Sequence, residues 1–244
     1  MDRQENSQMD QAPARRRRAS GRVLALLFAA PLFIGSLSGC QILIGTLLTL
    51  QGRPMTTCDF TKMSHGRKLT EKGKKVIVVC SSTAEAQMEE PSLDFDVIAE
   101  VSRRLKVEKV KVVDDHKVAS WLDDRGSITD ESQLDPIGAQ FGADYIILFK
   151  FTKFGYLEEN SPAYFRGHAS YRVVVVEMVD DELKPGKKRA KTIYNKPFAS
   201  KFPTQQPISA EQYGSPDTFK SQYKRRLGQE LARLFIDYRP EDDI

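Results

Sequence analysis

Apolar and polar residues change their spacing several times between residues 76 and 151. Three short segments rich in apolar residues predict strands over residues 76–80, 109–113 and 145–151. The first is a continuous apolar run, which is typical of a strand buried on both faces. Between and beside these runs, apolar residues recur at helical spacing, which predicts helices over residues 92–106, 115–122 and 131–141. This β-α-β-α-β order predicts an α/β domain built on a mixed sheet.

The last third of the chain has a different spacing. Apolar and polar residues alternate in the first half of residues 165–179, and residues 189–201 follow after a charged turn, which predicts a long antiparallel hairpin. Ser215, Pro216 and Asp217 then supply the cap, the first-turn proline and the first-turn acid of a C-terminal helix. The predicted fold class is therefore α/β (α+β), with two or three layers.

The first fifty residues follow yet another pattern. A polar region ends in a cluster of arginines, and an uncharged apolar run begins at Val23 (VLALLFAAPLFIG). Small residues follow the run, in the order typical of a secretory signal. The site Leu37-Ser38-Gly39-Cys40 resembles the bacterial lipoprotein signal closely. In that family the peptide is cut before the cysteine, which then receives acyl chains such as palmitate.

The resemblance implies that residues 1–39 are a signal peptide and that Cys40 anchors the chain to a membrane. Gln41 follows the cysteine in place of an aspartate, and by resemblance this implies an outer-membrane protein facing the periplasm. An alternative is a retained membrane helix, because uncharged sequence continues to Leu50 and could span a bilayer of about 30 Å. Both interpretations place residues 51–244 outside the cytoplasm.

The charge of the chain resides mainly in this N-terminal region. The formal net charge is +4, but residues 1–39 hold six arginines and three acidic residues, so the remainder carries 31 basic and 30 acidic residues. The remainder divides into a lipidated N-terminus and linker, residues 40–75, and a single domain, residues 76–244. The basic residues of the C-terminal helix are expected to be a solvated face, so we expect no nucleic-acid partner.

A search for catalytic and metal-binding patterns is negative. The sequence has no G-x-S-x-G, Walker-type or G-x-G-x-x-G motif, and its three histidines lack the spacing of metal ligands. Asp114, Asp115 and His116 follow a predicted strand end, where α/β sheets bind ligands, although a turn and helix cap is the favoured interpretation. We therefore expect that the chain is not an enzyme and binds no cofactor or metal. The alternative is an envelope enzyme that uses residues 114–116.

Two further groups of residues are candidates for smaller roles. Cys58 and Cys80 could form a disulfide in an oxidising envelope, or Cys80 could simply be a small core residue. Tyr164, Phe165 and Arg166 lie at a loop-to-strand junction, where aromatics beside an arginine suit a protein contact. Tyr164 could instead only cap the core.

The order of elements, with Gly142-Ala143-Asp144 directly before the strand at 145–151, resembles a small α/β domain of envelope proteins. Its members include the N-terminal domain of the Tol–Pal propeller protein, the curli-secretion lipoprotein and the lipoprotein activators of penicillin-binding proteins. The resemblance covers residues 75–238. It implies a non-enzymatic lipoprotein that binds an envelope protein in cell-wall synthesis, secretion or transport. No propeller repeat follows, so the Tol–Pal role does not carry over.

An oligomeric secretion-channel subunit is the second hypothesis. Residues 165–201 would then be the assembling hairpin. Several basic residues of this segment disfavour a lipid-facing surface: Arg166, Arg172, Lys188, Arg189 and Lys191.

Overall fold

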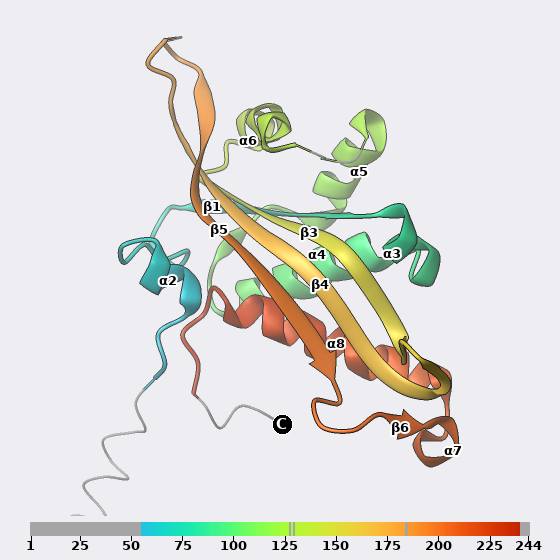
Figure 1. Ribbon diagram of the computed structural model, residues 1–244. Helices are drawn as coiled ribbons and strands as arrows, with labels where there is room; N and C mark the ends of the chain where they lie inside the picture. Colours follow the sequence, from blue (N-terminus) through green and yellow to red (C-terminus); the bar gives the residue numbers. More distant parts are fainter. Residues whose placement is uncertain (1–54, 127, 129, 184, 240–244) are drawn as a thin grey trace, which may run out of the picture. The chain divides into compact units, whose positions relative to one another are not determined.

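The computed structural model describes residues 55–126, 128, 130–183 and 185–239 (Figure 1). The predicted signal peptide, the Leu37-Ser38-Gly39-Cys40 motif and the first part of the predicted linker lie outside the described residues. Among the residues that are described, no helix is long and apolar enough to cross a membrane.

The domain is organised around one mixed sheet with strand order β2-β1-β3-β4-β5, and β6 pairs with β4. The strands are β1 (Lys75–Ser82), β2 (Lys111–Val112), β3 (Tyr145–Glu158), β4 (Ser161–Asp180), β5 (Lys188–Phe202) and β6 (Ile208–Ser209). β1 is parallel to β2 and β3, whereas β3, β4 and β5 are antiparallel. The predicted α/β fold class and the long β4–β5 hairpin are confirmed.

Helices lie on both faces of the sheet. The helical segments are α2 (Asp59–Met63), α3 (Ala84–Glu89), α4 (Leu93–Val107), α5 (Asp115–Arg125), η1 (Glu131–Gln133), α6 (Leu134–Phe141), α7 (Ala210–Tyr213) and α8 (Pro216–Arg233). α4 and α8 bury one face, and α5 and α6 bury the other face at one end of the sheet (Figure 1). The domain therefore has three layers at that end and two layers elsewhere.

Local sequence explains most of these elements. Leu93, Val97, Val101 and Leu105 place a buried stripe on α4, as helical spacing requires. The Asp114 side chain accepts a hydrogen bond from a backbone N–H at the start of α5. Gly142 ends α6 with a left-handed φ of 58°, a conformation that glycine adopts without a steric penalty.

Two strand boundaries differ from the prediction. The strand expected at 109–113 shortens to β2, because Lys109 has a left-handed φ of 64° and the Val110 N–H bonds to the Leu105 carbonyl, which ends α4. The strand expected at 145–151 extends to Glu158 as β3, because β4 pairs with it along its length. Local periodicity carries no information about such a partner strand.

Residues 55–74, predicted to be linker, pack against the domain. Phe60 on α2 is fully buried, with its ring 5.9 Å from that of Tyr194 and 5.8 Å from that of Phe235. Thr56 forms a β-bridge with Tyr238, which joins this segment to the chain beyond α8. The folded domain therefore includes residues before β1, and only residues nearer the N-terminus remain candidates for linker.

Candidate functional site

A hydrophobic groove with polar groups at its rim lies between α4 and α8. The two helices approach closely, since a Cβ atom on Gly228 would lie 2.3 Å from Glu100 Cγ. Beside this contact is an open cavity of about 420 Å³. Apolar side chains form its floor, and its rim carries the charged residues Asp96, Glu100, Arg103, Lys224 and Arg225. Apolar pockets with a few convergent polar groups are the default candidates for binding sites.

A cluster of charged and hydroxyl groups occupies one end of this groove. Lys224 Nζ lies 2.8 Å from Asp96 Oδ2 and 3.5 Å from Glu90 Oε2. Ser92 Oγ lies 2.6 Å from Glu90 Oε1 and 2.8 Å from Asp96 Oδ2. The Tyr156 hydroxyl donates a hydrogen bond to Glu90 Oε2. The cluster thus joins α8 to the start of α4 and to β3.

The pKa shifts in this cluster favour ionised partners. Burial raises the pKa of Glu90, but its hydrogen bonds and Lys224 outweigh burial and hold this pKa below its ordinary value. Burial lowers the pKa of Lys224, and its carboxylate partners more than reverse that effect. Burial and the bond to Glu90 raise the pKa of Tyr156. None of these shifts moves a pKa towards neutrality, as general acid–base catalysis would require.

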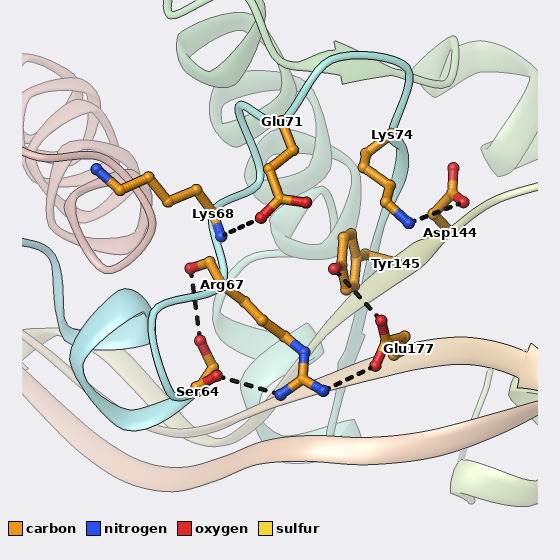
Figure 2. Close-up of polar contacts among 8 residues, drawn as sticks. All are labelled: Ser64, Arg67, Lys68, Glu71, Lys74, Asp144, Tyr145 and Glu177. Carbon is orange, nitrogen blue, oxygen red and sulfur yellow. Dashed lines mark hydrogen bonds and ion pairs between the residues drawn. The ribbon is translucent and has the colours of Figure 1, made fainter.

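A second polar network holds the segment before β1 on the sheet (Figure 2). The Arg67 guanidinium donates to the Ser64 carbonyl at 3.1 Å and pairs with Glu177 at 3.3 Å. The Tyr145 hydroxyl donates a hydrogen bond to Glu177 at 3.5 Å. Burial, and to a smaller extent the negative charge of Glu177, raise the pKa of Tyr145 to about 12. The network lies where β1 and β3 begin, whereas α/β sheets bind ligands at the carboxyl ends of strands. Its role is structural.

Cys58 and Cys80, which could have formed a disulfide, are both free and buried in the structure. Cys58 Sγ lies 3.1 Å from Thr61 Oγ1 beside α2, and the neighbouring Asp59 pairs with Lys196 of β5. Cys80 belongs to β1, which β3 and β4 separate from β5. A disulfide requires the two Cα atoms to be within about 7 Å. The interpretation of Cys80 as a small core residue fits its position.

The Asp114–His116 segment behaves as a helix start. Asp114 caps α5 by accepting from the Lys117 N–H, and Asp115 pairs with Lys106 at 3.1 Å. The His116 ring lies 5.9 Å from the Phe95 ring and borders an open surface hollow. Ser120 of the same helix also lines this hollow, and the hydrogen bonds and ion pair of the segment fit the turn-and-cap interpretation.

The predicted contact at Tyr164, Phe165 and Arg166 is only partly accessible. Tyr164 is 42% exposed, but Phe165 is buried and its ring stacks on Phe219 at 5.0 Å. Arg166 is largely covered, because it pairs with Glu158 at 3.1 Å and donates to the carbonyls of the turn after β5. The alternation of β4 turns Phe165 inward, so of the two aromatics Tyr164 is the exposed one.

The groove residues were not identified from the sequence. Glu90 and Lys224 are distant in the chain and belong to no motif, and Lys224 was assigned only to the polar face of the C-terminal helix. Within the part of the chain that the structure describes, no three His, Cys, Asp or Glu side chains gather as potential metal ligands.

No protein-family model matches the chain, and no curated protein matches it in sequence. Several solved structures are similar at low identity. The lipoprotein GNA1162 from Neisseria meningitidis is 11% identical, with a TM-score of 0.38, and covers 65% of this chain and 98% of its own. The hypothetical protein CT253 from Chlamydia trachomatis is 15% identical, with a TM-score of 0.37, and covers 66% and 96%. A PelC dodecamer from Paraburkholderia phytofirmans is 9% identical, with a TM-score of 0.39, and covers 75% and 96%. Similarities this weak carry no argument about function.

Proposed function

We propose that the chain is a lipid-anchored, non-enzymatic protein of the bacterial cell envelope, and that its α/β domain binds another envelope protein. The observation that carries this proposal is the Leu37-Ser38-Gly39-Cys40 motif at the end of an apolar run, behind a cluster of arginines. Acylation requires the cysteine thiol as the nucleophile that forms the thioether. Cleavage requires small residues before the cysteine, because the peptidase site is tight.

The groove between α4 and α8 supports binding over catalysis. Its titratable groups neutralise one another, and the pKa values of Glu90 and Lys224 are shifted so that both remain charged at neutral pH. Such groups form ion pairs and hydrogen bonds but have little tendency to exchange protons with a substrate. The apolar floor and charged rim of the groove resemble the composition of a protein-binding surface.

The anchor can be tested by labelling cells that express the full chain with an alkyne analogue of palmitate. We expect label on the wild-type chain, no label on Cys40→Ser, and normal label on the control Cys58→Ser. Globomycin, which blocks the lipoprotein signal peptidase, is expected to cause an uncut precursor to accumulate. An intact Met1 on the untreated membrane-bound chain would support the retained membrane helix and refute the lipoprotein assignment.

Outer-membrane location is a separate part of the proposal and has its own test. Gln41→Asp should move the lipidated chain from the outer-membrane to the inner-membrane fraction, and the control Gln41→Asn should leave it in place. An unchanged distribution of the aspartate variant would contradict sorting by this residue. The size of the wild-type chain in detergent then separates a partner-binding protein from a channel subunit, because large ring-like particles would favour the channel.

A further inference from the structure

One part of the central sheet is covered by helices on a single face. α5 and α6 cover only the upper end of the sheet in Figure 1, and the lower parts of β3, β4 and β5 have α4 and α8 on their other side (Figure 1). Leu148 and Val174 are the last residues buried beneath α5 and α6 on this face. Beyond them the same face carries Lys150, His168, Arg172 and Lys201, which we call the basic sheet face.

Strand register places these four side chains on one surface. Lys150 lies directly opposite Arg172, and His168 lies directly opposite Lys201. Directly paired residues of neighbouring strands share a face of the sheet. The alternate residues Phe149, Phe151 and Tyr171 are buried among α4 and α8, so Lys150 and Arg172 point the other way.

The cations of this face lack acidic partners within the domain. Across the residues that the structure describes, Lys150, Arg172 and Lys201 take part in no ion pair, and Arg172 donates only to the Asn195 amide oxygen at 2.9 Å. The opposite face differs, because Lys196 pairs there with Asp59 at 3.0 Å. Lys150, Arg172 and Lys201 are thus left without an ion-pair partner among the described residues, whereas Arg166, two residues before His168 on β4, pairs with Glu158 at 3.1 Å.

This arrangement works against the stability of the isolated domain. Like charges directly opposite each other on neighbouring strands are destabilising, and Lys150 and Arg172 form such a pair. An anionic group seated between them would convert the repulsion into two attractions. The second basic pair, His168 and Lys201, lies four residues further along β4, which is about 13 Å. The face therefore offers two separate positions for carboxylates.

The remaining residues of the face are small or polar. They are Ser81, Thr152, Ser170, Asn195, Pro197, Ala199 and one further cation, Lys153, which lies opposite Ser170. Surfaces that lie on membranes combine cations with large apolar side chains that insert between lipids. Between its two basic pairs this face has no large apolar side chain among the described residues, and its small residues there allow close approach of a protein surface.

We propose that the basic sheet face docks an acidic surface of a partner protein, with carboxylates seated at the Lys150–Arg172 and His168–Lys201 pairs. This inference rests on the proposed function, since it gives the chemistry of the partner that the domain binds. The contact is electrostatic and is expected to weaken as salt concentration rises.

The test uses site-specific photocrosslinking of the full chain in intact cells. In one variant a benzophenone amino acid replaces Ala199, which is exposed on the basic sheet face. In a second variant it replaces Arg225, on the rim of the α4–α8 groove. We expect the probe at position 199 to capture one protein through an acidic segment, identified by mass spectrometry. Lys150→Glu should reduce this crosslink at least tenfold, and the control Lys72→Glu, an exposed lysine before β1, should leave it unchanged.

Stability separates a binding defect from a folding defect. Lys150→Glu places a carboxylate opposite Arg172, so Tm should rise by about 1–4 °C while the crosslink is lost. If this variant fails to fold, Lys201→Glu at the exposed edge strand replaces it. Capture from position 225 but not from 199 would overturn the docking face and leave the proposed function intact. A phospholipid adduct at 199 would overturn the acidic protein in favour of a membrane, and no protein capture from either position would contradict the proposed function itself.

Discussion

The close packing of α8 against β4 gives a prediction that can be worked through in detail. A Cβ atom on Gly167 of β4 would lie 2.4 Å from Cγ of Tyr223 on α8. Tyr223 is fully buried, and its ring stacks on that of Phe154 at 5.7 Å. The ring of Tyr156 lies 6.2 Å away on another side. Gly167→Ala therefore forces a fully buried ring to move.

The size of the effect follows from two opposing contributions. Overpacking a well-filled core costs about 1–3 kcal/mol. Replacing glycine by alanine also restricts the unfolded chain, which stabilises the folded state by about 0.4–1 kcal/mol. The expected net loss in the free energy of unfolding is about 1–2 kcal/mol, or a Tm lower by about 2–8 °C for a domain of this size.

Gly155→Ala is the matched control. Its Cβ atom would lie 2.6 Å from Cε1 of His168, a similar clash, but His168 is half-buried on the uncovered face and its ring can turn into solvent. The free energy of unfolding should stay within about 0.5 kcal/mol of the wild-type value.

Urea unfolding followed by far-UV circular dichroism measures both variants under the same conditions. Equal stability of Gly167→Ala and the wild-type chain would refute the reasoning, because α8 would then have room to move. An equal loss of unfolding free energy in both variants would show that the half-buried His168 is as constrained as the buried Tyr223. That result would also refute the reasoning, because the difference between the two sites would have no effect.

Three further predictions concern the N-terminal part of the domain, the ion-pair cluster and the thiols. Phe60→Ala should lower the free energy of unfolding by about 3–5 kcal/mol because its ring is fully buried, whereas Met63→Ala, 58% exposed, should change it little; equal effects would contradict the packing of this segment. Glu90 has a folded-state pKa below its ordinary 4.5, so its stabilisation is present above pH 4.5 and is lost as pH falls through the folded-state value. Glu90→Gln should accordingly be less stable at pH 7 and nearly equal to wild type at low pH, and a gap in the unfolding free energy that persists in acid would contradict this role. Cys58 and Cys80, whose pKa values burial raises, should resist iodoacetamide in the native chain and react in urea without reductant; two thiols that stay unmodified in urea would restore the disulfide.

The periodicity of apolar residues predicted the buried face of an element correctly wherever that element buries one side and exposes the other. The apolar stripe of α4 and the alternation of β4 were predicted in this way and are confirmed. The polar cluster at the groove could not be predicted, because Glu90 and Lys224 come together only when α8 packs beside α4. Nothing in the sequence around either residue differs from an ordinary solvated charge.

The sequence by itself determined the lipoprotein-like motif ending at Cys40, the α/β fold class and the inward face of the main elements. Only the tertiary structure decided that Phe60 belongs to the core and that Lys150 lies opposite Arg172. The physical reason is that burial of a face imposes a short repeat on the local sequence, whereas strand register and helix docking are set by contacts between residues far apart in the chain. The uncompensated charge of the basic sheet face becomes visible only once that register is known.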